Sequence, residues 1–295
     1  MERHPGLVRP YFETADEVLD IPLSRLCLEG GAEELRDTSV TQPAVYLVSL
    51  IAAAILREQG IMPSVVAGHS LGEYTALASA GVLDWVDGLR LVRQRGLLMA
   101  EVNRRTPGRM AAVIGLPAER VRELCEEVAG ARRTVVEVAN YNSAQQTVVS
   151  GATDGVAEVS RRAGAEGASH VAELKVGAPF HCSLMADVAA EFGEHLAATS
   201  FRTPSVPVVA NVAASYVHSG PEARELLGEQ LAAPVRWHET LNLLGREEVS
   251  GVVEVGPGRV LTNLSRSVHP GVPALPAGTA RQIDKAVEQL SGAPV

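Results

Sequence analysis

The sequence G-H-S-L-G at residues 68–72 constrains the fold of this chain more than any other segment. Before it, Ser64–Ala67 has the composition of a short buried strand, and after it Leu71–Ala80 is rich in alanine and leucine and predicts a helix. A G-x-S-x-G sequence between a strand and a helix is typical of a sharp turn that exposes the serine hydroxyl, with both glycines giving the backbone room. The backbone N–H of Leu71 is expected at a helix N-terminus, where it can stabilise an oxyanion. The pattern predicts acyl transfer through an acyl-serine at Ser70.

Strand-like and helix-like segments alternate along the chain, which predicts an α/β fold. Pro107-Gly108 breaks the pattern, and from there to Gly177 the predicted order of elements is β-α-β-β-α-β, the split-βαβ arrangement of small ferredoxin-like domains. We therefore predict a large, discontinuous α/β-hydrolase-like domain with a short parallel sheet at residues 1–107 and 178–295. A small ferredoxin-like domain at residues 108–177 is inserted into it. Further helices are expected at Pro43–Arg57, Asp84–Val102 and Ser183–Thr199, and further strands at Val206–Asn211 and Gly251–Val255.

Composition excludes several classes of protein. The chain has 295 residues, of which 46% are hydrophobic, so it can bury a full core and is not disordered. Its formal net charge of −9 argues against a nucleic-acid-binding protein. The three cysteines have neither metal-ligand nor disulfide-framework spacing, no signal peptide is visible, and the longest apolar run, Pro43–Leu56, is too short to span a membrane. We expect a cytoplasmic protein with no metal, cofactor, nucleic-acid or membrane partner.

A serine nucleophile needs a base, and the chain offers eight histidines. His181 is the best candidate, because it follows the predicted domain boundary and precedes a predicted helix, which places it at the crevice between two domains. His238 and His269 remain alternatives, and an ordinary histidine at a helix start has the same pattern. His69 adjoins the serine but points elsewhere along the turn, so we expect it to have a structural role.

Arg95 is the second informative residue. On the predicted helix Asp84–Val102 it shares one face with four residues that are all apolar, Leu91, Leu98, Met99 and Val102. A buried guanidinium is costly unless an anion meets it. Two interpretations stay open: a salt bridge to a core Asp or Glu, or a fork that accepts a substrate carboxylate in bidentate fashion.

Two arginine pairs, Arg132-Arg133 and Arg161-Arg162, lie on predicted surfaces of the inserted domain. Most such pairs are only solvated, although in a net-acidic protein they could guide an acidic partner. The segment E-V-G-P-G at 254–258 follows a predicted strand and precedes Arg259–Ser267. We expect it to form a structural loop that packs against the site.

Together these motifs resemble the malonyl-CoA:acyl-carrier-protein transacylase family, which includes the acyltransferase domains of fatty-acid and polyketide synthases. The resemblance covers nearly the whole chain. It rests on T-Q-P-A at 41–44, G-H-S-L-G-E-Y at 68–74, Q-R-G at 94–96, M-A-A-V at 110–113, N-Y-N-S at 140–143, A-P-F-H at 178–181, P-V-R-W at 234–237 and E-V-G-P-G at 254–258. Several long motifs in the right order are far more specific than any one of them.

The resemblance implies a Ser70–His181 dyad rather than a triad, with the histidine oriented by a backbone carbonyl near Arg236. The acyl group is then expected to move from a CoA thioester to Ser70, and on to the phosphopantetheine thiol of an acyl carrier protein. Arg95 is expected to bind the free carboxylate of malonyl-CoA. The other expected site residues are the backbone of Leu71 for the oxyanion and, for substrate binding, Gln42, Phe180, Met99 and Asn142.

Within this family, Phe180 before the histidine and Leu71 after the serine favour malonyl over methylmalonyl, since methylmalonyl-selective members more often have Y-A-S-H. The main alternative is an acyl-carrier-protein-directed hydrolase of the same fold, which needs a site open to water and no carboxylate-binding arginine. A generic α/β-hydrolase esterase places its histidine late, at His238 or His269, and does not fit the inserted segment. Retention of both Ser70 and His181 disfavours a non-catalytic binding module.

One departure from the family concerns the start of the chain. Family members begin with a buried strand and an F-P-G-Q-G-x-Q loop that supplies a second oxyanion N–H, whereas residues 1–5, M-E-R-H-P, resemble the helical region beyond that loop. We expect the natural protein to be longer; the alternative is a chain that lacks a central strand and half of its oxyanion hole. The 295-residue chain is then expected to be weakly active or poorly soluble, because exposed sheet edges promote association.

Overall fold

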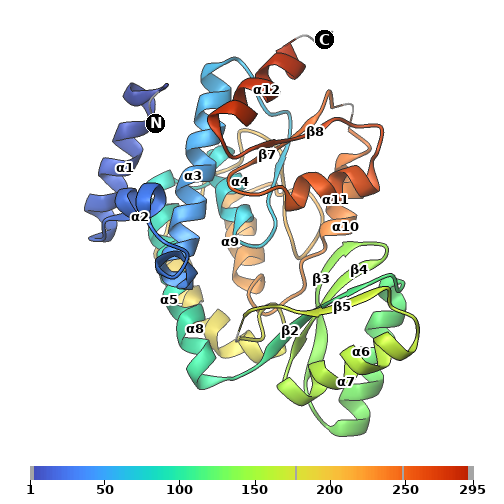
Figure 1. Ribbon diagram of the computed structural model, residues 1–295. Coiled ribbons are helices and arrows are strands. Elements are labelled where there is room, and N and C mark those ends of the chain that lie inside the picture. Colours follow the sequence, from blue (N-terminus) through green and yellow to red (C-terminus); the bar gives the residue numbers. More distant parts are fainter. Residues whose placement is uncertain (1–2, 177, 248, 292–295) are drawn as a thin grey trace.

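Helix α3 (Thr38–Glu58) lies at the centre of the larger part of the molecule in the computed structural model, which describes residues 3–176, 178–247 and 249–291 (Figure 1). It packs against α1 (Pro5–Leu19), α4 (Gly72–Ser79) and α5 (Trp85–Arg105). By length and composition α3 could cross a membrane, but 67% of its most apolar 18-residue stretch is buried inside the molecule. Its apolar surface is therefore accounted for by the protein core.

The start of α3 shows why the helix is longer than predicted. Asp37 caps it by accepting a hydrogen bond from the Ser39 N–H, so the helix begins before Pro43 rather than at it. Pro43 has no N–H and cannot bond to the Ser39 carbonyl one turn earlier. Arg93 of α5 donates to that carbonyl instead, so the proline is accommodated without an unpaired acceptor.

Two short parallel sheets lie in the larger part. Strand β1 (Val66–Ala67) pairs with β6 (Val208–Val209), and β7 (Val252–Val255) pairs with β8 (Ala274–Ala277). Among the described residues no backbone pairing joins these two pairs, so the predicted short parallel sheet is divided in two. The remaining helices here are α2 (Leu23–Glu29), α8 (Ala186–Ala197), α9 (Gly220–Glu229), α10 (Trp237–Leu244), α11 (Val260–Val268) and α12 (Ala280–Ser291), with 3₁₀ turns at Glu34–Arg36 and Ser183–Met185.

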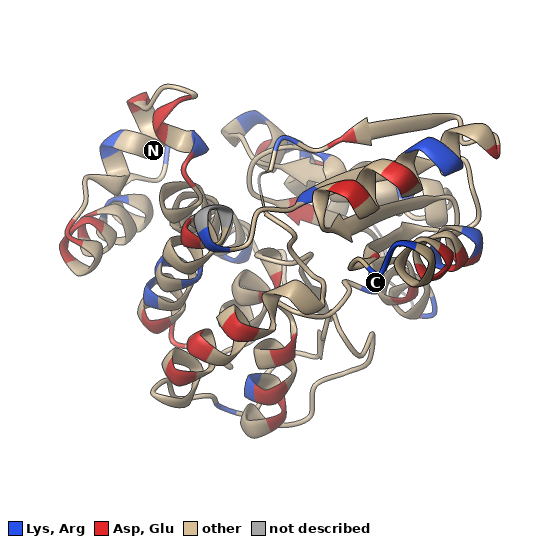
Figure 2. Cartoon of the chain, turned by 90° about the horizontal axis from the view of Figure 1, so that it is seen from below, with Lys and Arg blue, Asp and Glu red and all other residues tan. Residues whose placement is uncertain are grey.

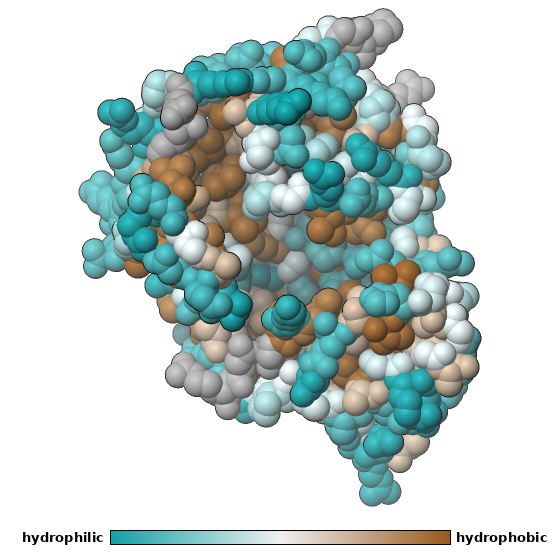
Figure 3. All heavy atoms as spheres, viewed as in Figure 1, coloured by the Kyte–Doolittle hydropathy of each residue, from teal (hydrophilic) through white to brown (hydrophobic). Residues whose placement is uncertain are grey.

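A cavity of about 930 Å³ is lined by both β1 and β7. Apolar side chains from α3, α10 and α12 complete its walls, among them Leu56, Leu241 and Leu290. The molecular face drawn in Figure 3 is hollowed, and apolar residues line much of the hollow. The cavity reaches the back of the 68–72 turn at its two glycines, but Ser70 does not line it. The nucleophile therefore faces away from this cavity.

Residues 109–173 contain a four-stranded antiparallel sheet with two helices packed against it (Figure 1). In chain order its elements are β2 (Arg109–Ile114), α6 (Ala118–Arg132), β3 (Val136–Ser143), β4 (Gln146–Gly151), α7 (Thr153–Ala165) and β5 (His170–Glu173). The strand order is β3-β4-β2-β5, which gives the predicted β-α-β-β-α-β arrangement. This unit has a hydrophobic cluster of its own, centred on residues such as Val113, Leu124 and Val159. Gly177, the predicted end of the inserted domain, lies outside the described residues.

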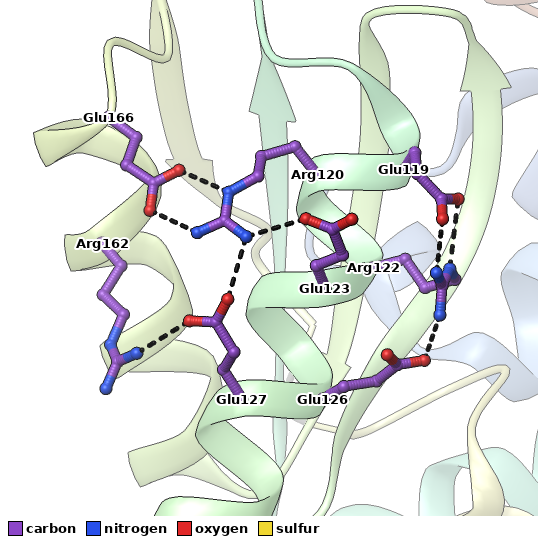
Figure 4. Close-up of polar contacts among 8 residues, drawn as sticks. All are labelled: Glu119, Arg120, Arg122, Glu123, Glu126, Glu127, Arg162 and Glu166. Atoms are coloured by element: carbon purple, nitrogen blue, oxygen red, sulfur yellow. Dashed lines mark hydrogen bonds and ion pairs between the residues drawn. The ribbon is translucent and has the colours of Figure 1, made fainter.

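Ion pairs join α6 to α7 on the surface of this unit (Figure 4). Arg120 of α6 binds Glu166, just after α7, through two N–O contacts of 2.7 Å. Glu158 of α7 accepts hydrogen bonds from three arginines, Arg132, Arg161 and Arg162. Three of the four arginines that could have guided an acidic partner are therefore engaged within their own domain.

Candidate active site

Ser70 lies in the turn between β1 and α4, where its backbone is left-handed at φ 51°. Non-glycine residues rarely adopt this conformation, and it persists only where surrounding contacts impose it. Asn211, just after β6, supplies such contacts. Its side-chain oxygen accepts the Ser70 N–H at 2.7 Å, and its amide donates to the Gly68 carbonyl at 2.6 Å. Since β1 and β6 are parallel neighbours, both residues leave the sheet at the same edge, and Asn211 fixes the turn.

Gly68 is the glycine that this turn requires, and the expectation that Gly72 is needed as well is wrong. A Cβ on Gly68 would lie 2.0 Å from the backbone of Gly72, whereas a Cβ on Gly72 meets nothing within 4 Å. We expect Gly68→Ala to displace Ser70 and slow its acylation by about 100-fold or more. Gly72→Ala should stay within about threefold of wild type and melt no lower, since alanine is the better helix former.

Acylation rates and melting temperatures of these two variants, measured side by side, check the prediction. A Gly68→Ala chain that acylates at the wild-type rate would show that the turn tolerates a side chain at this position.

His181 lies between β5 and the 3₁₀ turn Ser183–Met185, with Nε2 2.8 Å from Ser70 Oγ. Its Nδ1 lies 2.8 Å from the carbonyl oxygen of Gln230. A carbonyl only accepts, so Nδ1 carries the proton and Nε2 is free to accept from the serine hydroxyl. Burial, together with the charge of Arg95, lowers the pKa of His181 to about 3, so the ring is a neutral base at ordinary pH. The structure thus brings the predicted nucleophile and base together.

Arg95 of α5 is 1% exposed, and its guanidinium reaches the nucleophile. One terminal nitrogen donates to Ser70 Oγ at 3.0 Å and to Gln230 Oε1 at 3.3 Å, and the other donates to Gln42 Oε1 at 2.7 Å. Its Nε has no partner, and in the described part of the chain Arg95 forms no ion pair with a carboxylate. The structure therefore does not support the salt-bridge interpretation, and it leaves a buried cation beside the nucleophile.

Three of the predicted substrate-binding residues lie around this cation and the base. Gln42 accepts from Arg95, and its amide nitrogen lies 3.1 Å from Met99 Sδ, so this pair holds the guanidinium in place. Phe180 is buried in the main core, directly before His181 in the chain. Their contacts with a substrate stay a prediction.

Asn142 of β3 contacts His69, the residue directly before the nucleophile. Its side-chain oxygen accepts a hydrogen bond from His69 Nε2 at 2.9 Å. The His69 ring also packs edge-on against Trp237, with ring centroids 5.5 Å apart. His69 thus ties the turn to the inserted sheet, which is a structural role. It also engages the side chain of Asn142, whose contact with substrate stays a prediction.

The prediction that the backbone near Arg236 orients the histidine is wrong, because Gln230 supplies that carbonyl. The reason is that the chain around Val235 pairs with β3, exchanging hydrogen bonds with Ala139 and Tyr141. The Val235 carbonyl therefore accepts from the inserted sheet, and the Arg236 carbonyl accepts the Thr240 N–H of α10 at 3.0 Å. The Arg236 N–H donates to the Asn211 carbonyl, also at 3.0 Å.

The other two candidate bases are engaged elsewhere. His238 Nε2 accepts from Asn242 one turn along α10, at 3.3 Å. His269 Nε2 donates to the Leu241 carbonyl at 2.8 Å. Neither is hydrogen-bonded to Ser70, which leaves His181 as the base.

Gln230 is one of the site residues that sequence reasoning missed. Besides orienting His181, its side-chain nitrogen donates to the Ser70 carbonyl at 2.9 Å and to Glu73 Oε2 at 2.6 Å. Its side-chain oxygen accepts from Arg95. A single glutamine between α9 and α10 carries no sequence signal of such a role, because all four of its partners come from distant segments.

Comparison with known proteins decides the family. Residues 12–285 match the family described as acyl transferase domain. The chain belongs to this family. It is similar to the malonyl CoA-acyl carrier protein transacylase of Bacillus subtilis strain 168, with 38% identity over 279 residues, 95% of this chain and 88% of that protein. The transacylase of Escherichia coli K12 is also 38% identical, over 89% of this chain and 84% of its own length.

Solved structures of acyl transferases confirm the fold. The malonyl CoA-acyl carrier protein transacylase of Coxiella burnetii superposes with a TM-score of 0.92 at 34% identity, covering 97% of this chain and 90% of that one. A type II polyketide-synthase malonyl-transacylase, solved in complex with its acyl-carrier protein, gives 0.91 at 37% identity, covering 96% and 91%. The family and fold class predicted from the motifs are therefore confirmed.

Proposed function

We propose that this acyl transferase moves a malonyl group from CoA to the phosphopantetheine thiol of an acyl carrier protein. The observation that carries the proposal is the buried guanidinium of Arg95, 3.0 Å from Ser70 Oγ and without a carboxylate partner among the described residues. The free carboxylate of a malonyl thioester can pair with this fork, whereas an acetyl group leaves the cation unpaired. The names of the similar proteins, including one solved with its carrier protein, support the same substrates.

In the first half-reaction, Ser70 Oγ attacks the thioester carbonyl carbon while His181 Nε2 takes the hydroxyl proton. The Gln230 carbonyl, bound to Nδ1–H, stabilises the imidazolium that forms. The Leu71 N–H stands at the start of α4, where the first N–H groups have no intrahelical acceptor, and donates to the oxyanion. The C–S bond then breaks, and His181 returns the proton to the sulfur of CoA, leaving malonyl-Ser70.

The second half-reaction uses the same pair in reverse. The phosphopantetheine thiol gives its proton to His181 as its sulfur attacks the ester carbonyl. The bond from the acyl carbon to Ser70 Oγ breaks, and the serine recovers a proton from the imidazolium. This ping-pong sequence needs no cofactor, since malonyl-CoA is a substrate.

Surface charge fits a protein partner rather than a nucleic acid. Figure 2 shows Lys and Arg interspersed with Asp and Glu on the helices, with no continuous basic face in that view. Cys125 and Cys182 are free, buried thiols, as suits a reducing compartment. We infer a cytoplasmic enzyme.

The deciding experiment is intact-mass detection of acyl-Ser70 after mixing with malonyl-, methylmalonyl- or acetyl-CoA. We expect a malonyl adduct that forms fastest, persists in buffer and is discharged by a holo acyl carrier protein. An adduct that breaks down to free malonate without carrier protein would instead identify the hydrolase of the same fold. Equal rates with malonyl- and acetyl-CoA would contradict selection by Arg95.

A further inference from the structure

Glu73 lies in the first turn of α4, three residues after the nucleophile, and is 2% exposed. Its Oε1 accepts the Asn211 N–H at 3.3 Å, and its Oε2 accepts from Gln230 Nε2 at 2.6 Å. These partners hold the two reacting groups: Asn211 binds the Ser70 N–H, and Gln230 supplies the carbonyl that orients His181. Glu73 therefore connects Asn211, which holds the nucleophile, to Gln230, which orients the base.

Hydrogen-bond polarity fixes the charge of this carboxyl group. Arg95 can only donate, so the side-chain oxygen of Gln230 must face it. The nitrogen of the same amide then faces the Ser70 carbonyl and Glu73. The Asn211 backbone N–H can likewise only donate. Both oxygens of Glu73 thus face donors, and a proton on either would have no acceptor among these contacts.

We propose that the Glu73 carboxylate is a positioning residue that keeps Ser70 and His181 aligned through Asn211 and Gln230. The proposal rests on the acyl-serine chemistry proposed above, but not on the identity of the acyl group. A neutral Glu73 turns an O–H toward a donor, and Gln230 cannot reverse its amide without placing its NH₂ group against Arg95. The Gln230 side chain must then shift, and its backbone carbonyl, which accepts from His181 Nδ1–H, shifts with it.

The reaction is expected to depend on pH through Glu73. Burial raises the pKa of Glu73 to about 7, while the hydrogen bonds from Gln230 and Asn211 and the charge of Arg95 act in the opposite direction. Arg95 stays charged over this range. His181 and Tyr74 stay neutral near this pH, because burial lowers the pKa of His181 to about 3 and raises that of Tyr74. Ionised Glu73 is the aligned form, so alignment is lost as the pH falls through its pKa.

The test is the reaction of Ser70 with a fluorophosphonate, followed by intact mass from about pH 5 to about pH 8 in wild type and in Glu73→Gln. This probe needs an aligned Ser–His pair but neither CoA nor a carboxylate, so it reports alignment even if malonyl transfer fails as the natural reaction. We expect the wild-type rate to fall below about pH 7. Glu73→Gln should react about 10- to 100-fold more slowly, without that fall. With malonyl-CoA, the variant should lose kcat while KM changes by less than about threefold.

Glu158→Gln is the matched control. Glu158 is also a buried carboxylate with several donors, but it lies in the inserted unit, and its arginines lower its pKa to about 2. This control should keep the wild-type rate and pH profile. A Glu73→Gln chain that reacts at the wild-type rate overturns the proposal. A wild-type fluorophosphonate rate that does not change between about pH 5 and about pH 8 also overturns the proposal. This second measurement gives an answer even if Glu73→Gln does not fold.

Discussion

Replacing Ser70 with alanine should abolish labelling by malonyl-CoA, and replacing His181 with alanine should slow it by about 10⁴- to 10⁶-fold. In the proposed reaction Ser70 Oγ is the oxygen that forms the ester bond with the malonyl group. Without His181, whose Nε2 lies 2.8 Å from Ser70 Oγ, the hydroxyl has no neutral base to take its proton. Because His181 acts only through Ser70, the double variant should lose no more than Ser70→Ala alone. Rapid-quench labelling with radioactive malonyl-CoA, with peptide mapping, measures both effects.

His238→Ala is the control for this prediction, because the structure places that histidine on Asn242 of its own helix. It should label within about threefold of wild type, as expected for a residue outside the reacting pair. Malonyl found on another residue of the wild-type chain, or a loss in His238→Ala equal to that in His181→Ala, would show that the nucleophile or the base is wrongly assigned.

Local patterns were sufficient for most elements but not for their ends. Ser64–Ala67 was expected to be a four-residue strand, whereas β1 comprises only Val66–Ala67, which pair with β6. Strand length depends on its partners, and these come from a segment about 140 residues later that no local pattern reveals. Conversely, α3 begins early because the Asp37 cap, a local signal, outweighs the proline at which the helix was expected to start.

The same distinction applies to the site. Ser70, Arg95 and His181 could be predicted because each has an unusual local setting: a strand-turn-helix, an apolar helix face and a predicted domain boundary. Gln230 and Asn211 could not, because they are ordinary polar residues that gain their roles only when packing places them against the turn. The error at Arg236 has the same origin, since the pairing of Val235 with β3 decides where nearby carbonyls point.

Arg95→Ala should separate malonyl from acetyl transfer more sharply than any other substitution in the site. Loss of a buried, bidentate pair with the substrate carboxylate costs on the order of 2–5 kcal/mol, which corresponds to roughly 30- to 4,000-fold in kcat/KM for malonyl-CoA. Acetyl-CoA has no carboxylate, so in wild type it leaves the buried Arg95 guanidinium without a carboxylate partner among the described residues. Removing that cation should leave acetyl transfer unchanged or raise it.

Arg95→Lys tests whether charge alone is sufficient. Lysine keeps the cation but lacks the planar fork, so it cannot hold both the carboxylate and the Gln42 oxygen that Arg95 binds at 2.7 Å. We expect it to recover only part of the malonyl activity while acetyl transfer stays low. Steady-state kcat/KM for both thioesters in wild type and the two variants gives the ratio directly. Because the guanidinium also donates to Ser70 and Gln230, its loss could instead disturb the nucleophile itself. Equal losses for malonyl and acetyl would establish that structural role and remove Arg95 as the determinant of substrate.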